Sequence, residues 1–172
     1  MGEILIRRWQ PGDDLSAITA LLHRAYAELA EMGFRYTATW QDDEKTLQRL
    51  SRGMVFIAES DGQIVGTVTL YLPPCKSSCA WYDRPDVARF GQLAVDPEFQ
   101  RRGIGSRLMD VVENETHAHG VPNLALDTAA GAHHLIALYQ KRGFSIVSKA
   151  DWKSTNYESV IMNLAFGDPK LR

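Results

Sequence analysis

Residues 93–108 read LAVDPEFQRRGIGSRL, and this stretch decides how the rest of the chain is interpreted. The apolar run Leu93-Ala94-Val95 leads into a turn with two arginines, and two glycines one residue apart then begin an amphipathic helix. At the start of a helix, successive backbone N–H groups point into one concavity at the positive end of the helix dipole. Gly103 and Gly105 have no Cβ to keep phosphate oxygens away from the main chain. The stretch therefore predicts a binding site for a diphosphate group.

Two blocks of the sequence resemble the GNAT superfamily of acyl-CoA-dependent N-acyltransferases. The first block is Gln100-Arg101-Arg102-Gly103-Ile104-Gly105, which follows a strand ending in Val-Asp-Pro. The second block is Leu138-Tyr139-Gln140-Lys141-Arg142-Gly143-Phe144, which matches the pattern Leu-Tyr-x-x-x-Gly-Phe that is frequent in this superfamily. Two blocks in the right order and at roughly the right spacing are more specific than one glycine pair. The resemblance implies an N-acetyltransferase that moves an acetyl or other acyl group from coenzyme A directly to a primary amine.

Length and charge are those of an ordinary globular protein. At 172 residues the chain has the size of about one domain, and we expect a single domain over residues 1–172. The formal net charge of −2 gives no general attraction to nucleic acid. No apolar run is long enough to cross a membrane or to form an export signal, so we expect a cytoplasmic protein without a membrane partner. Cys75 and Cys79 have no further ligands nearby in sequence, which favours two free thiols in a surface loop over a metal site.

Hydrophobic periodicity and turn signals predict the element order β-α-α-β-β-β-α-β-α-β-β. The expected strands cover residues 3–9, 54–59, 63–72, 87–95, 123–127, 144–147 and 157–164. The expected helices cover residues 15–33, 42–52, 103–119 and 133–142. Gly91 inside its strand indicates a bulge or a close backbone approach. The order predicts an α/β fold with a central mixed sheet of about seven strands flanked by four helices, which agrees with the superfamily resemblance.

The resemblance also implies where acetyl-CoA lies. In such folds the pantetheine arm of the cofactor lies between two splayed parallel strands and pairs with one of them. Here that strand is Leu93-Ala94-Val95, whose unpaired main-chain groups would bond the amides of the arm. A main-chain N–H near Leu93 would stabilise the oxyanion of the tetrahedral intermediate. No metal is implied.

The diphosphate would lie on the backbone N–H groups of six consecutive residues, namely Arg101, Arg102, Gly103, Ile104, Gly105 and Ser106. Gln100 belongs to the same motif, and the two arginines add positive charge that suits phosphate. One position departs from the family pattern. Many relatives carry an asparagine seven residues before the tyrosine, and here that position is Ala132. We expect either that the neighbouring His133 replaces this cofactor contact or that the contact is absent.

Two residues are candidates for acid and base. By resemblance, Tyr139 lies near the sulfur and protonates the departing thiolate, a role that suits a phenol because it stays neutral at physiological pH. Asp127 ends its strand where some relatives carry an acidic residue, and it could take the proton of the attacking amine. Asp127 could equally cap the turn before the next helix. His133 and His134 are weaker candidates for the base, because a histidine at a helix start is more often solvated.

The acceptor site is expected between the first helices, the loop after Leu72 and the loop around Trp152. Aromatic and acidic side chains in these regions suit a cationic amine; they are Tyr26, Glu28, Glu31, Phe34, Tyr36, Trp40, Asp83, Asp86, Trp152 and Tyr157. Three arginines of the same regions, Arg35, Arg84 and Arg89, would instead suit a carboxylate. The sequence does not choose between the two sets. A small-molecule amine is favoured because the aromatic residues could close a pocket over it.

Other interpretations stay open. A protein N-terminus or a lysine side chain could be the acceptor, and a homodimer is possible because many relatives pair. The fold could also bind acyl-CoA as a sensor without catalysis, although Tyr139 argues against this. A dinucleotide-binding Rossmann domain is disfavoured because Leu108 occupies the third glycine position and hairpins replace repeated βαβ units.

Overall fold

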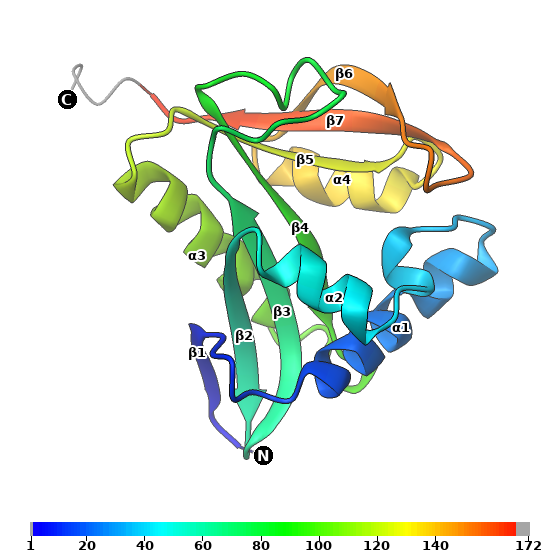
Figure 1. Ribbon diagram of the computed structural model, residues 1–172, viewed down its shortest axis with the longest axis vertical. Helices are drawn as coiled ribbons and strands as arrows, with labels where there is room; N and C mark the ends of the chain where they lie inside the picture. Colours follow the sequence, from blue (N-terminus) through cyan, green and yellow to red (C-terminus); the bar gives the residue numbers. More distant parts are fainter. Residues whose placement is uncertain (1, 168–172) are drawn as a thin grey trace.

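One mixed sheet unites the strands of the chain in the order β1-β2-β3-β4-β5-β7-β6 (Figure 1). The computed structural model describes residues 2–167. The strands are β1 (Ile4–Arg8), β2 (Met54–Ser60), β3 (Gln63–Tyr71), β4 (Val87–Val95), β5 (Asn123–Ala129), β6 (Ser145–Asp151) and β7 (Glu158–Ala165). The helices are α1 (Leu15–Glu31), α2 (Asp43–Leu50), α3 (Ile104–Ala118) and α4 (His133–Lys141), with 3-10 turns η1 (Thr37–Thr39) and η2 (Pro97–Phe99).

The predicted fold class and element order are confirmed, with differences at element ends. The two 3-10 turns were not predicted. Strands β5 and β6 extend beyond the prediction, to Ala129 and Asp151. Both strands pair with β7 along most of its length, so hydrogen bonds between strands continue where the local sequence pattern becomes weak.

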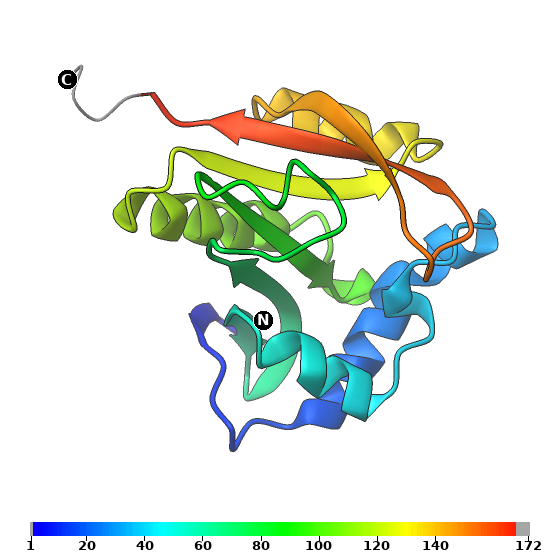
Figure 2. The same ribbon diagram turned by 45° about the horizontal axis from the view of Figure 1, so that its top comes forward.

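Helices cover both faces of the sheet (Figures 1 and 2). Alternate residues of β2 divide between the faces, as the two-residue period of a strand requires. Phe56 joins the core under α3 and α4, and Val55 and Ile57 join the core under α1 and α2. The loop between β3 and β4 covers β5 and β7 on the latter face.

That loop corrects the expectation for the cysteines. Both are free thiols, but Cys79 is buried rather than on the surface, and Cys75 is half-buried. Cys79 packs in a cluster with Tyr82, Val87 and Ala125. Within residues 2–167 no group of three metal-binding side chains comes together. No helix in this described range is long and apolar enough to span a membrane.

The feature that positions the site is a divergence of β4 from β5. The two parallel strands pair only where Val87–Arg89 meet Asn123–Ala125, and Figure 1 shows them running apart beyond that point. Gln92 has a left-handed φ of 53°, and the register between β3 and β4 shifts at the same place. The prediction of a bulge was therefore close, but the irregular residue is Gln92 and not its neighbour Gly91. Such a bulge bends β4, and beyond Arg89 the edge of β4 on the β5 side has no strand partner.

Candidate active site

Two cavities meet where β4 and β5 diverge. The α3–α4 cavity, about 790 Å³, lies between the end of β4, the start of α3 and helix α4. The α2 cavity, about 440 Å³, lies between α2, the β3–β4 loop and the β6–β7 loop. The two linings have five residues in common, which are Tyr26, Tyr36, Leu93, Asp127 and Tyr139. The two cavities therefore adjoin at these five residues.

The glycine turn before α3 presents free backbone donors to the α3–α4 cavity. Gly103 caps the helix with φ +76°, and Arg101 before it also has a positive φ of 60°. The first amide to bond back along the helix is that of Arg107, which donates to the carbonyl of Gly103 at 3.0 Å. Among residues 2–167, no backbone acceptor bonds the N–H groups of residues 101–106. This run of free donors at a helix start can bind a phosphate-like anion.

Most of the predicted cofactor residues line the α3–α4 cavity. Those that do are Leu93, Ala94, Val95, Gln100, Arg101, Gly103, Ile104, Gly105 and Ser106. Arg102 does not line it; its guanidinium packs over the Phe99 ring and donates to the Glu98 carbonyl at 3.1 Å. His133 is exposed outside the cavity, and the next residue, His134, lines it instead.

The far end of α4 adds two cations that the sequence analysis missed as site residues. Lys141 and Arg142 line the α3–α4 cavity. Arg142 is held by Asp110 and Glu113 of α3, each at 2.7 Å. Both cations stand inside the second sequence motif, two and three residues after Tyr139, and this position is the signal that could have identified them.

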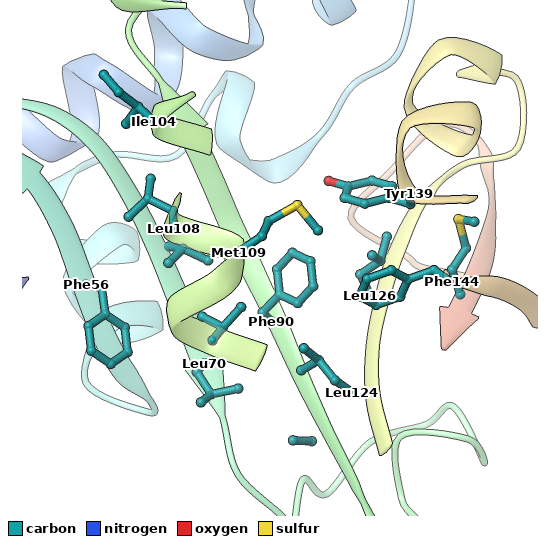
Figure 3. Packing of buried hydrophobic residues seen from close by; sticks show 14 of the residues in the cluster. Phe56, Leu70, Phe90, Ile104, Leu108, Met109, Leu124, Leu126, Tyr139 and Phe144 are labelled. Carbon is teal, nitrogen blue, oxygen red and sulfur yellow. The ribbon is translucent and has the colours of Figure 1, made fainter. Parts of the chain in front are cut away.

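Tyr139 lies at the junction with a free hydroxyl. Its ring packs edge-on against Phe90 and Phe144, with centroid distances of 6.3 and 6.0 Å. Figure 3 shows the hydroxyl turned away from Phe144, toward the side of Met109. Burial, with smaller contributions from neighbouring tyrosines and Asp127, raises the pKa of Tyr139 well above the usual value for a phenol. The hydroxyl is therefore a neutral proton donor at any physiological pH.

The side chain of Asp127 is held by two hydrogen bonds, one to each carboxylate oxygen. Tyr82 donates its hydroxyl to Oδ1 at 2.9 Å, and Trp152 donates its indole N–H to Oδ2 at 3.0 Å. The two rings stack with an interplanar angle of 8°. The alternative role as a helix cap is wrong, because α4 is capped at Ala132 without any side-chain hydrogen bond. Burial and the neighbouring carboxylate raise the pKa of Tyr82 well above its ordinary value, so this donor stays protonated.

Tyr82 was not predicted, and its role depends on a contact across the fold. It precedes Asp127 by 45 residues. The only local signal is the aromatic pair Trp81-Tyr82 in an otherwise polar segment.

Beside the α2 cavity, the β6–β7 loop lies against the segment that follows α1 (Figure 2). Asn156 of the β6–β7 loop accepts from the Arg35 amide at 2.8 Å and donates to the Gly33 carbonyl at 2.9 Å. The rings of Tyr36 and Tyr157 approach to 4.8 Å between centroids. Of the predicted aromatic residues, Tyr26, Tyr36, Trp40, Trp152 and Tyr157 line this cavity, and Phe34 instead packs behind Tyr157. The hydrogen bonds thus tie the two loops together where they line the cavity.

The charges around the α2 cavity differ from the predicted acidic set. Four cationic side chains line it, namely Lys45, Arg49, Arg52 and Arg89, whereas Asp127 is the one carboxylate from the described residues that does so. None of the other acidic candidates reaches this cavity; Glu28 lines the α3–α4 cavity, and Asp86 pairs with Arg84 at 2.7 Å.

Of the three predicted arginines, Arg89 alone lines the α2 cavity, because Arg35 packs over the Trp40 ring and Arg84 over the Trp81 ring. The cations of α2 were missed, although a signal was available. Lys45, Arg49 and Arg52 are spaced four and three residues apart, which places them on one side of a helical segment.

Comparison with known proteins shows the family to which the chain belongs. A sequence model of the Acetyltransferase (GNAT) family matches residues 16–144. The chain is 30% identical over 137 residues to S-(2-succino)cysteine N-acetyltransferase of Bacillus subtilis (strain 168), covering 76% of this chain and 78% of that protein. It is 24% identical over 143 residues to S-alkylcysteine N-acetyltransferase of the same organism, covering 78% and 75%.

The fold is also found among solved structures. The crystal structure of the ribosomal-protein-S18-alanine N-acetyltransferase from Escherichia coli superimposes with a TM-score of 0.72. The two sequences are 21% identical, and the match covers 95% of this chain and 94% of that one. At this identity the similarity concerns the fold.

Proposed function

The chain belongs to the GNAT family of acetyltransferases and is an acyltransferase enzyme; we propose that its donor is acetyl-CoA and its acceptor a small-molecule primary amine. The observation that carries this proposal is the meeting of the two cavities at Tyr139. Strands from residues 4 to 165 share one sheet, which supports a single catalytic domain over the whole chain. A cytoplasmic location and a homodimer remain predictions of the sequence.

The α3–α4 cavity fits coenzyme A. Its run of free amides over residues 101–106 suits the diphosphate, and Gly103 adds no Cβ to the space in front of them. The edge of β4 around Leu93-Ala94-Val95 has no strand partner on the β5 side, which suits the amides of a pantetheine arm. When bound, acetyl-CoA supplies an activated acyl group, whose carbonyl carbon bonds to the amine nitrogen as its bond to sulfur breaks.

We assign the proton transfers to two side chains at the junction. Tyr139 donates its proton to the departing sulfur, because its hydroxyl is neutral and free of protein partners within the described part of the chain. Asp127 accepts the proton that the amine loses, while Tyr82 and Trp152 hold the carboxylate in place. A main-chain N–H near Leu93 donates to the thioester oxygen. Arg102 and His133 do not line the cavity, so the proposal gives them no role. Their contacts with the cofactor remain predictions of the sequence.

The acceptor class rests on the α2 cavity. Asn156 ties the β6–β7 loop to Gly33 and Arg35, so the cavity is bordered by joined loops, as a pocket for a small molecule requires. The two relatives from Bacillus subtilis are named for cysteine derivatives. A peptide acceptor is the second candidate, because the E. coli structure with the same fold is named for a ribosomal-protein alanine. A sensor without catalysis is disfavoured by the free hydroxyl of Tyr139.

A thiol-release assay tests the proposal. Purified protein and acetyl-CoA are mixed with an S-alkylcysteine, with S-(2-succino)cysteine and with a peptide that begins with alanine. We expect release of CoA thiol with the cysteine derivatives and none with their N-acetylated forms, which lack a free amine. Faster turnover of the peptide would favour the protein acceptor. Calorimetry that detects no binding of CoA or acetyl-CoA would refute the assignment of the α3–α4 cavity.

A further inference from the structure

We propose that the acceptor is an anionic amino acid, and that Arg89 in the α2 cavity binds a carboxylate on its side chain. This inference rests on the proposed transfer to a small-molecule amine and specifies which amines react. It concerns a group that the acyl transfer itself does not use.

The surroundings of Arg89 point to a missing anionic partner. Its guanidinium carbon lies 4.4 Å from the ring centroid of Tyr71 and 5.3 Å from that of Tyr82. Its Nε is buried and has no hydrogen-bond acceptor among residues 2–167. No carboxylate within that range lies close enough to form an ion pair with it. Arg89 is half-buried and lines the α2 cavity, so a carboxylate in the cavity can bond the N–H groups of its guanidinium that face the cavity and pair with its charge.

The other cations of the cavity approach the same region from α2. The hydroxyl of Tyr71 donates to the carbonyl of Arg49 at 3.2 Å, while the ring of Tyr71 packs against Arg89. This contact involves the main chain of Arg49, whose guanidinium donates to Oε1 of Gln41. Lys45 and Arg52 line the cavity on the same side of α2 as Arg49. Such a group of cations repels a simple amine and attracts a molecule whose negative charges outnumber its ammonium group.

Asp127 offsets one of the four positive charges and leaves the cavity with an excess of cations. Its two oxygens already accept from Tyr82 and Trp152, and it is the one carboxylate that the described residues contribute to the cavity. Tyr82 also sets the distance between the proposed base and the proposed carboxylate site, because its hydroxyl bonds Asp127 and its ring contacts the guanidinium of Arg89. An acceptor amine near Asp127 and a carboxylate near Arg89 are thus about one tyrosine side chain apart. An amino acid with an acidic side chain has its charges arranged in this way.

The phosphates of a cofactor are a poor alternative occupant. Arg89 stands near the start of the β4 segment that lines the site, whereas the free amides of residues 101–106 follow its end. Arg101 and Lys141 already supply positive charge on the α3–α4 side, where Arg142 is paired with Asp110 and Glu113. The cofactor phosphates therefore have cations of their own in the α3–α4 cavity. They do not account for the four cations of the α2 cavity.

A matched pair of acceptors tests the inference. S-Carboxymethyl-L-cysteine and S-carbamoylmethyl-L-cysteine differ only by a carboxylate in place of a neutral amide of the same shape. We expect kcat/KM to be about 10- to 100-fold higher for the carboxylate, mainly through a lower KM, as for a charged hydrogen bond. O-Phospho-L-serine is measured alongside, because its phosphate is also an anion, with a charge of about −1.5 to −2 at pH 7, and its faster reaction would overturn the choice of carboxylate.

The variant Arg89→Gln should remove most of this preference, and Arg89→Lys should retain part of it. Lys153→Gln is the matched control, since Lys153 is an exposed cation between two residues that line the cavity but does not line it itself. This control should keep the full preference. The ratio of the two substrates is measured on one enzyme sample, so a loss of folded protein in a variant cancels.

Equal kcat/KM for the two cysteines in the unmodified enzyme would overturn the inference and leave the N-acetyltransferase assignment intact. Retention of the preference in Arg89→Gln would also overturn it. If no amine in any assay is acetylated and CoA does not bind, the proposed function itself fails, and the inference fails with it.

Discussion

Replacement of Gly103 by alanine separates the role of the glycine turn in binding from its role in stability. Gly103 has φ +76°, and a Cβ there would meet no atom within 4 Å, so the native-state cost is backbone strain alone. A left-handed alanine costs about 1–2 kcal/mol. The alanine also restricts the unfolded chain, which offsets about 0.4–1 kcal/mol of this cost. The net loss of about 1 kcal/mol should lower Tm by roughly 2–4 °C in a protein of this size.

Gly120 at the other end of α3 provides the matched control. Its φ is +68°, and a Cβ there would also meet no atom within 4 Å. Gly120→Ala should therefore lose about the same stability, ~1 kcal/mol. It lies outside the residues that line the α3–α4 cavity, so its affinity for CoA should not change.

The difference between the two variants is expected in CoA affinity. Relaxation of the strained turn in Gly103→Ala reorients neighbouring amides, and each charged hydrogen bond to phosphate contributes about 1.5–3 kcal/mol. Loss of one such bond should raise the Kd by about 10- to 100-fold in titration calorimetry. Equal CoA affinity in the two alanine variants would refute the assignment of the diphosphate to this turn.

Three further results are expected. Tyr139→Phe should change the free energy of unfolding by less than about 0.5 kcal/mol and keep acetyl-CoA binding, but slow turnover roughly 10²- to 10⁴-fold; near-normal turnover would remove Tyr139 as the acid. Asp127→Asn leaves Tyr82 or Trp152 without an acceptor and should cost about 1–3 kcal/mol in urea unfolding. Its activity should recover as pH rises and the amine loses its proton unaided, and a loss that is constant with pH would contradict the role of base. Arg7 donates to Asp13 and holds the pKa of that carboxyl below its usual value, so this stabilisation is present above about pH 4 and is lost as pH falls through the folded-state pKa. Asp13→Asn should therefore cost about 1 kcal/mol at pH 7 and progressively less in acid, and an unfolding difference that does not vary with pH would contradict this account.

Predictions from local sequence were accurate where one segment determines its own structure. The glycine turn and the free amides after Arg101 follow from backbone geometry within a few residues. The strand and helix order follows from hydrophobic periods, which the alternation of Val55 and Phe56 across the sheet illustrates. Where the predicted lining of the α3–α4 cavity was wrong, the error could be as small as one residue. His133 and His134 differ by one position, yet only His134 faces the cavity, because successive helix residues point about 100° apart.

Local sequence could not predict which charged side chains line the acceptor site. The sequence listed both acidic and basic candidates there and had no means of choosing, because either set could lie at the surface. In the fold, Asp86 pairs with Arg84, whereas Arg89 turns into the cavity beside Tyr71. Arg49 reaches the same cavity from α2, which the sequence analysis did not include in the acceptor site.

By itself, the sequence determined the turn over residues 101–106 through local backbone geometry, and its hydrophobic periods and two motifs were enough to predict the α/β fold and the family. The tertiary structure alone decided how Asp127 is held and which charges surround the acceptor. Tyr82, Asp127 and Trp152 come from separate segments, and their hydrogen bonds exist only after the sheet has brought those segments together. Side-chain partners of this kind depend on long-range packing, which no local period or motif encodes.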